Sequence, residues 1–348
     1  MRYKYRIAIV KEWRLMKCAK RETTKLAEGA NQVPVTIITG FLGAGKTTVI
    51  NHLVNQPGMK DTALIINEFG EIGLDNLLIE SAIENTLVLE NGCICCSIRG
   101  DLVDTIIDLF IKQQNDLIPK FSRILIETTG LAQPGPIAET LTAEKLLADR
   151  CSLKNIVAIV DGQQGLRQLE SHHEVAAQLA QADLALISKS DLSDEGALEA
   201  LGKRVTAINP ALTVQMIKNG EIDPDVLFHS ELHLNRNKPA HHHHEEHDLA
   251  TVETWSFNSS EPLDAERLQD WLTMLYSLRP FAMLRLKGIL QLIGQEQPVL
   301  LQAVGSSFSP PEELDSWPGG FEETNLVLIF RNISSQEIET SFKQHVLK

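Results

Sequence analysis

The sequence VPVTIITGFLGAGKTTVINHLVNQ, residues 33–56, places an apolar run, a glycine-rich turn and a helical pattern in direct succession. Val33–Thr39 is rich in β-branched residues, which is typical of a strand buried in a parallel sheet. The turn GFLGAGKT, Gly40–Thr47, fits the pattern G-x-x-x-x-G-K-[ST] of a phosphate-binding loop. Such a loop requires a strand before it and a helix after it, because backbone amides at the helix start face the phosphates. The stretch therefore predicts a P-loop nucleotide-binding domain.

The residues of this loop have separate expected roles. The ammonium group of Lys46 would neutralise the β- and γ-phosphates, and the hydroxyl of Thr47 would hold Mg²⁺. Glycines let the backbone approach the phosphates without a Cβ in the way. The expected nucleotide-binding residues of the loop are Gly40, Gly43, Ala44, Gly45, Lys46, Thr47 and Thr48.

A second strand, in the sequence ILIETTG at 124–130, ends at Glu127. A carboxylate at this position would bind the magnesium, directly or through water. Aspartate is more usual here, so Glu127 departs from the pattern, and a strand-end carboxylate without a role is the alternative. With Lys46 and Thr47, Glu127 makes up the predicted catalytic set.

The sequence SKSD, Ser188–Asp191, follows a later apolar strand and favours guanine as the base. Asp191 is expected to accept from guanine N1–H and N2–H, a donor pair that adenine lacks, while the stem of Lys189 packs along the base. Ser188 stands where this motif usually has asparagine, and its single hydroxyl cannot span two partners as an amide does. The substitution is expected to weaken nucleotide affinity, and it leaves GTP favoured over ATP.

Strands and helices alternate over the first two thirds of the chain, which predicts an α/β domain with a mostly parallel sheet covered on both faces. The pattern then changes to a strand, a helix, three strands in succession and a closing helix. That order predicts a smaller α+β domain with an antiparallel sheet and helices on one face. Asp264 and either Ser334 or Ser335 are the expected helix N-caps. The expected divisions are a flexible basic extension at 1–32, a P-loop domain at 33–233, a linker at 234–249 and a C-terminal domain at 250–348.

Composition narrows the class of protein. The 348 residues carry a formal net charge of -14, which argues against binding to nucleic acid or to an anionic membrane. The apolar runs are strand-sized, well short of the ~20 residues of a membrane-spanning helix. Five cysteines form no disulfide framework and no signal peptide is visible, so the cytoplasm is the expected compartment. The basic extension is also compatible with a start codon placed too early, with Met16 as the alternative.

Three of the five cysteines lie in ENGCICCS, residues 90–97. Thiolates suit Zn²⁺, and Cys93 and Cys96 have the spacing by which a turn brings two sulfurs onto one metal. Cys95 joins them only if the backbone turns tightly, which Gly92 eases. From spacing alone, a redox-active dithiol and buried packing remain alternatives to a metal site.

Two further stretches carry metal-ligand chemistry. NEFGE, residues 67–71, follows the second strand, where P-loop GTPases place a switch that responds to the γ-phosphate. Glu71 is the predicted fourth zinc ligand, with a substrate group or water as the other candidates. Glu68 is another candidate contact, and a solvated turn is the alternative. The internal HHHHEEH, 241–247, is expected either to collect metal loosely or to be a plain polar linker.

Other notable side chains have plainer expected roles. Arg285 and Lys287 should share one face of a strand, directed at the first domain, at a partner or simply at solvent. His172 and His173 are expected on an ordinary helix surface. Trp255, Trp271 and Trp317 are expected in a core or a domain interface.

The motifs together closely resemble the CobW/YjiA-type P-loop GTPases. The matching stretches are TGFLGAGKTT (39–48), NEFGE, NGCICC (91–96), ILIETTG, SKSD, the histidine-rich linker and RLKG (285–288). The resemblance covers about residues 33–346 and implies a GTPase domain followed by a smaller α+β domain, with GTP, Mg²⁺ and Zn²⁺ bound. Ile66 stands where some relatives carry an acid, so a metal site that uses this acid is not expected here.

The resemblance also implies a function. It predicts a GTPase, slow without a partner, that delivers a transition metal, most often zinc and sometimes cobalt, to a client metalloprotein. A protein that buffers or senses zinc and uses GTP only as a structural ligand is the alternative. An ATP-dependent kinase is disfavoured by SKSD, and a homo-oligomer is compatible with the sequence.

Overall fold

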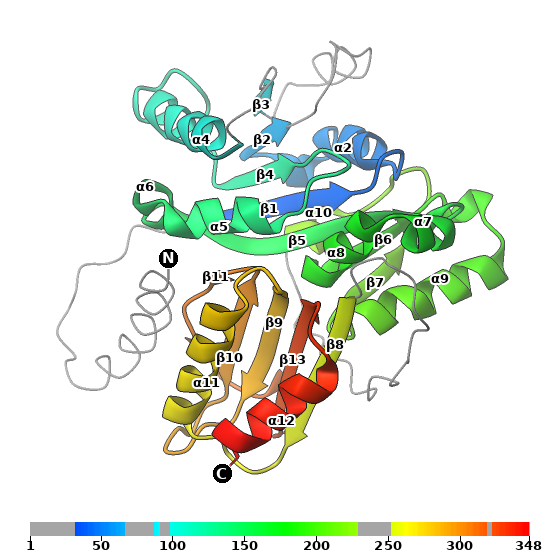
Figure 1. Ribbon diagram of the computed structural model, residues 1–348. Coiled ribbons are helices and arrows are strands. Elements are labelled where there is room, and N and C mark those ends of the chain that lie inside the picture. The colour runs from blue at the N-terminus through cyan, green and yellow to red at the C-terminus, as the bar shows by residue number, and fades with distance from the viewer. Residues whose placement is uncertain (1–31, 67–86, 91–97, 229–251, 319–321, 348) are drawn as a thin grey trace. The chain divides into compact units, whose positions relative to one another are not determined.

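The computed structural model describes residues 32–66, 87–90, 98–228, 252–318 and 322–347 (Figure 1). These residues belong to two compact units. The P-loop unit consists of Ala30–Thr206 and Leu212–Glu231, and the C-terminal unit contains Ala207–Ala211 and Leu232–Lys348.

The P-loop unit is built on a sheet of seven described strands, all paired in parallel, in the order β3-β2-β4-β1-β5-β6-β7. The strands are β1 (Val33–Gly40), β2 (Thr62–Ile66), β3 (Leu87–Glu90), β4 (Arg123–Glu127), β5 (Cys151–Asp161), β6 (Leu184–Ser188) and β7 (Thr213–Met216). The apolar side chains of β1, β2, β4, β5 and β6 are mostly buried, as the β-branched runs predict for a parallel sheet covered on both faces. The predicted α/β class is confirmed.

Helices cover both faces of this sheet (Figure 1). The helices are α2 (Lys46–Val54), α4 (Ile98–Gln114), α5 (Gly135–Ala143), α6 (Lys145–Ala148), α7 (Gly165–Ser171), α8 (His173–Gln181), α9 (Glu195–Ile208) and α10 (Pro224–Phe228), with 3₁₀ turns η1 (Pro57–Met59) and η2 (Ser190–Leu192). On one face, α2, η1 and α10 pack a core that includes Ile50, Leu53 and Phe228 against β1, β2 and β4. On the other face, α5, α6 and α8 pack against β1 or β5.

The strand register brings several predicted motifs to one edge of the sheet. Ile66, the last residue of β2, is paired with Glu127 on one side and with Glu90 on the other. Glu127 is in turn paired with Ile38 of β1, two residues before the P-loop. The chain therefore leaves β1, β2, β3 and β4 from neighbouring points, since paired strands lie about 4.8 Å apart.

The C-terminal unit contains an antiparallel sheet in the order β11-β10-β9-β13-β8, with β12 also paired to β10. Its strands are β8 (Val252–Ser259), β9 (Met283–Leu290), β10 (Val299–Val304), β11 (Ser307–Phe308), β12 (Glu312–Glu313) and β13 (Thr324–Arg331). Helices α11 (Ala265–Leu278) and α12 (Ser335–His345) share one core with the sheet. The predicted α+β domain with helices on one face is confirmed.

Both helices begin at the predicted caps. The side chain of Asp264 accepts from the backbone N–H groups of Glu266 and Arg267. Ser334 and Glu337 form a reciprocal capping box at the start of α12. The sequence signal of a short polar residue before an apolar period thus fixes where each helix starts.

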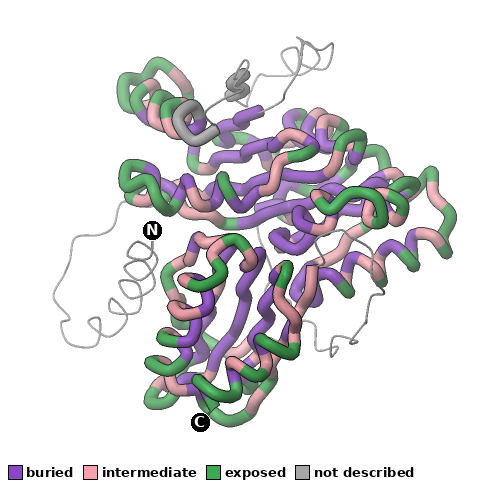
Figure 2. Tube along the Cα trace, viewed as in Figure 1, coloured by how far each residue is buried: buried purple, intermediate pink, exposed green. Residues whose placement is uncertain are grey.

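The core of the C-terminal unit is strongly aromatic. The ring of Phe342 on α12 lies 4.9 Å from Trp255, 4.7 Å from Phe257 and 5.1 Å from Trp271, measured between centroids. Figure 2 shows buried residues along the sheets and exposed residues on the outer sides of the helices. Trp255 and Trp271 are therefore core residues, as expected, whereas Trp317 is half-buried.

Arg285 and Lys287 differ from one of the expectations. They lie on β9 and alternate with Leu286, a core residue, so they share the predicted face of the strand. Their exposed fractions are only 3% and 4%, which rules out the solvated strand face. Ile289 on the same face is also buried, so this face of β9 is covered.

Within the described part of the chain, no helix combines the length and the apolar character needed to cross a membrane.

Candidate functional site

The predicted phosphate loop forms the connection between β1 and α2. Gly40 has φ of 146°, and a Cβ there would lie 2.4 Å from the carbonyl oxygen of Ile159, so only glycine fits. Lys46 is 8% exposed, and its Nζ donates to the carbonyl oxygens of Gly40 at 2.9 Å and Phe41 at 3.3 Å. The ammonium group therefore lies inside the curve of the loop, where it can meet phosphate oxygens.

The first turn of α2 is open to an anion. Its N-cap, Gly45, has a left-handed conformation and supplies no side-chain cap. The first backbone N–H groups of a helix have no partner within the helix, and the helix dipole adds positive charge at this end. Thr47 and Thr48 follow in that turn, half-buried and exposed. The local geometry is that of a phosphate-binding helix start.

Glu127 lies beside this loop at the end of β4 and is 2% exposed. The next residue, Thr128, is tied to β1 through its N–H to Ile38 O at 2.9 Å and its hydroxyl to Thr39 Oγ1 at 3.0 Å. A buried carboxylate is stable where it meets a cation, and Mg²⁺ prefers oxygen ligands such as carboxylates. With the hydroxyl of Thr47 as a second oxygen donor, the residues present fit a magnesium ion.

Gly130, the last residue of the strand motif ILIETTG, approaches the P-loop closely. A Cβ on Gly130 would lie 2.6 Å from Leu42 Cδ2 and 2.7 Å from the backbone nitrogen of Leu42. The side chain of Leu42 can rotate away, but its backbone nitrogen belongs to the loop itself. The glycine therefore sets the position of the loop relative to β4.

We expect Gly130→Ala to weaken nucleotide binding by at least about tenfold, because the loop must shift to admit the methyl group. Titration of a fluorescent guanine nucleotide measures this directly. The matched control is Gly202→Ala in α9, where a Cβ meets no atom within 4 Å. The control should bind nucleotide normally, and it should be slightly more stable because alanine favours a helix. Equal nucleotide affinity of the two variants would contradict the proposed contact.

The SKSD segment at the end of β6 contacts the P-loop directly. Ser188 Oγ lies 2.6 Å from Ala44 O and 3.1 Å from Val160 O, so its hydroxyl lies between two acceptors from different segments. Lys189 Nζ donates to Gly43 O at 2.9 Å. Asp191 is exposed in η2, where its carboxylate is available to a base. The structure thus brings the predicted base-contacting and phosphate-contacting residues together.

Two contacts near the loop were not anticipated. Asp161, at the end of β5, accepts from Lys189 Nζ at 2.6 Å. The strand-end position in NIVAIVDG was its only sequence signal. His172 does not lie on a plain helix surface: it separates α7 from α8, and its ring stacks on Phe41 with centroids 4.5 Å apart.

The predicted zinc ligands Cys93, Cys95, Cys96 and Glu71 lie outside the described residues, as do Glu68 and the histidine-rich linker. Among the residues that are described, no group of three or more His, Cys, Asp or Glu side chains is arranged to hold a metal. Cys151 is buried, and burial raises the pKa of its thiol to about 11. This thiol stays protonated at neutral pH and is suited to packing rather than to metal binding.

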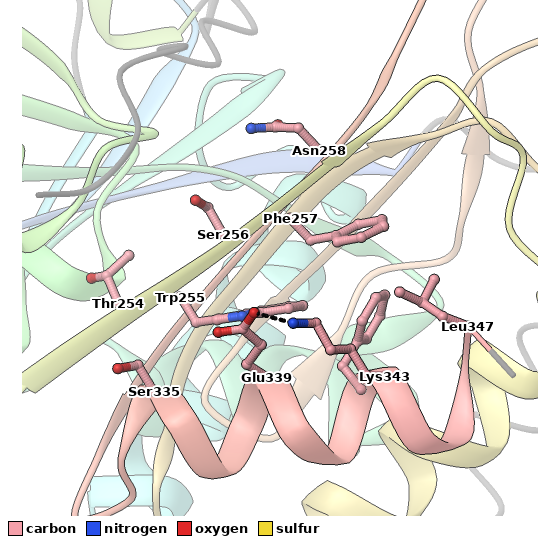
Figure 3. A pocket seen from close by; sticks show the side chains of 10 residues that line it. Thr254, Trp255, Ser256, Phe257, Asn258, Ser335, Glu339, Lys343 and Leu347 are labelled. Atoms are coloured by element: carbon pink, nitrogen blue, oxygen red, sulfur yellow. Dashed lines mark ion pairs between the residues drawn. The ribbon is translucent and has the colours of Figure 1, made fainter. Parts of the chain in front are cut away.

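A separate concavity lies in the C-terminal unit between β8 and α12 (Figure 3). Its volume is about 390 Å³, and its floor includes the aromatic rings of Trp255, Phe257 and Phe342. Glu339 and Lys343 form an ion pair of 2.6 Å on its α12 side. None of the predicted site residues lines it.

The geometry of the P-loop unit defines the class: this is a P-loop nucleotide-binding protein, with the SKSD segment held on the loop. Residues 34–216 match the family described as CobW/HypB/UreG, nucleotide-binding domain. Residues 252–346 match the cobalamin synthesis protein cobW C-terminal domain. The chain belongs to the CobW family, which confirms the resemblance seen in its motifs.

Full-length relatives support the same assignment. The chain is 32% identical to the zinc chaperone YjiA of Escherichia coli, over 90% of this chain and 98% of the relative. It is 28% identical to the zinc chaperone CobW of Pseudomonas aeruginosa, over 90% and 91%. The crystal structure of Zn(II)-bound YjiA GTPase from E. coli matches with a TM-score of 0.70 and 25% identity, covering 91% of this chain and 99% of that one.

Proposed function

We propose that this P-loop GTPase of the CobW family is a zinc metallochaperone, which couples GTP hydrolysis to the delivery of zinc to a client metalloprotein. The observation that carries the nucleotide part is the contact of SKSD with the P-loop, through Ser188 to Ala44 and Lys189 to Gly43. The zinc part is supported by the CxCC motif and by relatives named as zinc chaperones.

The nucleotide would be bound at both ends. Asp191 accepts from guanine N1–H and N2–H, and the stem of Lys189 packs along the base. The backbone of Gly40–Thr48 surrounds the phosphates, and Lys46 donates to the β- and γ-phosphates. Thr47 and Glu127 would hold Mg²⁺, which neutralises charge on the phosphates when bound. Turnover without a client should be slow, since this arrangement positions and stabilises charge without an assigned base.

Zinc would be held by Cys93, Cys95 and Cys96, with Glu71 as the fourth ligand. The strand register supports a link to the nucleotide, because the segments that contain these ligands begin directly after Ile66 and Glu90. Ile66 is paired with both Glu90 and the proposed magnesium ligand Glu127. The proposed magnesium ligand on β4 is thus one strand away from the segment that follows Ile66 and two strands away from the segment that follows Glu90.

The proposal predicts that zinc affinity depends on the nucleotide. Affinities measured with GDP and with a non-hydrolysable GTP analogue should differ by about 5–150-fold, the usual range of coupling between two sites. Competition with a fluorescent zinc chelator gives both values. Equal affinities would contradict the coupling and favour a zinc-buffering protein that uses GTP as a structural ligand.

Cysteine variants test whether zinc binds at the CxCC motif or elsewhere in the protein. Cys96→Ser should lose tight zinc binding and keep GTP binding, because the serine hydroxyl is a much poorer zinc ligand than a thiolate. Cys151→Ala is the matched control, since it removes a buried, protonated thiol outside the motif and should bind zinc as the wild type does. Loss of zinc binding in the control alone would show that the motif is not the site.

We further propose the domain limits 33–233 and 250–348, joined by the histidine-rich linker 234–249. A cytoplasmic location is proposed with them, because a reducing compartment keeps closely spaced cysteines from forming disulfides and leaves them free to bind zinc.

A further inference from the structure

Asp161 is a buried carboxylate for which the sequence patterns predict no role. It ends β5 and is 3% exposed. Its Oδ1 accepts from the backbone N–H of Gln163 at 2.8 Å and of Gln164 at 3.1 Å. Its Oδ2 accepts from Lys189 Nζ at 2.6 Å. The two oxygens therefore serve two different structures, the turn that leads into α7 and the lysine of SKSD.

Lys189 is held at three points. Its backbone is left-handed, with φ of 53°, and its carbonyl oxygen accepts from Ser193 Oγ at 2.8 Å. Its ammonium group donates to Gly43 O at 2.9 Å as well as to Asp161. The side chain of Lys189 is 35% exposed, whereas that of Asp161 is 4% exposed. A partly exposed cation is thus fixed between a buried anion and the phosphate loop.

The neighbouring residue repeats this connection without charge. Ser188 Oγ lies 2.6 Å from Ala44 O. Two consecutive residues of β6 and its following turn therefore contact two consecutive residues of the P-loop. The Ser188 hydroxyl has a single proton for two acceptors, Ala44 O and Val160 O. The ammonium group of Lys189 is charged, so its hydrogen bond to Gly43 O is the stronger of the two connections to the loop.

The charge on Asp161 explains why Lys189 stays in place. A lysine side chain is flexible, and an exposed ammonium group can exchange a neutral carbonyl partner for water with little loss. A hydrogen bond in which one partner is ionised is roughly twice as strong as a neutral one, and between Lys189 and Asp161 both partners carry charge. Asp161 is buried and tied to Gln163 and Gln164, so it offers a fixed anion rather than a mobile one.

We infer that Asp161 is a positioning residue for guanine nucleotides: it holds Lys189 against Gly43, so that the base-contacting lysine and the phosphate loop are fixed together before the nucleotide binds. The inference rests on the proposed binding of GTP. Its physical effect is preorganisation, because the free protein already has the arrangement that the nucleotide requires.

The variant Asp161→Asn tests this inference. The amide oxygen can still accept from Gln163 and Gln164, whereas the negative charge opposite Lys189 is lost. We expect KM for GTP and Kd for GDP to rise about tenfold, a usual size for coupling between residues in contact. The value of kcat should stay within about twofold, because Lys46, Thr47 and Glu127 are untouched. If Asp161 only stabilised the turn at Gln163 and Gln164, Asp161→Asn would change the unfolding midpoint and leave KM for GTP and Kd for GDP unchanged. That result would overturn the inference.

A double-mutant cycle tests whether Asp161 acts through Lys189. Lys189→Met should weaken GDP binding, and adding Asp161→Asn to it should cause no further loss. An equal loss in both backgrounds would overturn the inference. Glu199→Gln is the matched control, because it removes the carboxylate of another lysine pair, Glu199–Lys203 at 2.6 Å, on the exposed surface of α9. It should leave nucleotide binding unchanged.

Failure of the proposed function gives a different result. If the wild-type protein binds ADP as tightly as GDP, the assignment of guanine nucleotides is wrong and the inference about Asp161 falls with it. If the wild type prefers GDP and Asp161→Asn retains the full GDP affinity, only the role of Asp161 is wrong.

Discussion

Replacing Lys46 with methionine should lower kcat/KM for GTP hydrolysis by about 10²–10³-fold, the usual cost of removing one charge-stabilising donor from an active site. Lys46 is 8% exposed, and its Nζ donates to Gly40 O at 2.9 Å, so the ammonium group already lies within the loop. Methionine keeps much of the length and the apolar stem, while it removes the charge that would face the phosphates. Phosphate release under steady-state conditions measures the effect.

The control for Lys46 is a lysine that lies outside the proposed nucleotide site. Lys112→Met removes an ammonium group from the last turn of α4, where it pairs with Asp108 at 2.7 Å on the exposed surface. This variant should hydrolyse GTP at the wild-type rate, because an exposed pair contributes little. If Lys46→Met retained more than about a tenth of the wild-type activity, the loop would not be the site of hydrolysis.

Replacing Phe342 with alanine should destabilise the C-terminal unit by about 3–5 kcal/mol, the usual cost of removing a buried aromatic ring. Phe342 has 0% exposure and contacts Trp255, Phe257 and Trp271. Its loss leaves a cavity between β8 and α12 and removes the aromatic contacts that hold the helix on the sheet. Urea unfolding followed by tryptophan fluorescence reports on it, since Trp255 and Trp271 lie in the same core.

Phe281→Ala provides the comparison within the same unit. Phe281 is 72% exposed, so its truncation creates no cavity and should change stability by less than about 0.5 kcal/mol. The carbonyl oxygen of Phe281 that accepts from Arg331 belongs to the backbone and survives the substitution. Similar losses for the two phenylalanines would show that the Phe342 ring does not stabilise this core.

Much of the fold can be predicted from the sequence because its signals are local. The β-branched run of Val33–Thr39, the glycines after it and the apolar period of α2 each act over a few residues, and they agree with one another. The same holds for Asp264 and Ser334, since an N-cap bonds to residues two or three positions away. Local agreement of this kind is what makes element types predictable.

What could not be predicted depends on contacts between distant residues. Asp161 meets Lys189 across 28 positions of sequence, and Ser188 meets Ala44 across 144. The motif alone gives no sign that the hydroxyl of Ser188 reaches the carbonyl oxygen of Ala44 in the loop. The period of two predicts that Arg285 and Lys287 share one face of a strand, yet it carries no information about what covers that face.

The pairing of Ile66 with Glu90 and Glu127 has a consequence for how the metal preference of such a protein can change. The proposed zinc ligands come after the paired residues of β2 and β3, so substitutions of these ligands replace no residue of the described ladder. The type of metal ligand can therefore vary in evolution without loss of this strand pairing. A designer who wishes to exchange zinc for another metal can alter the two segments and keep the strands that carry the nucleotide site.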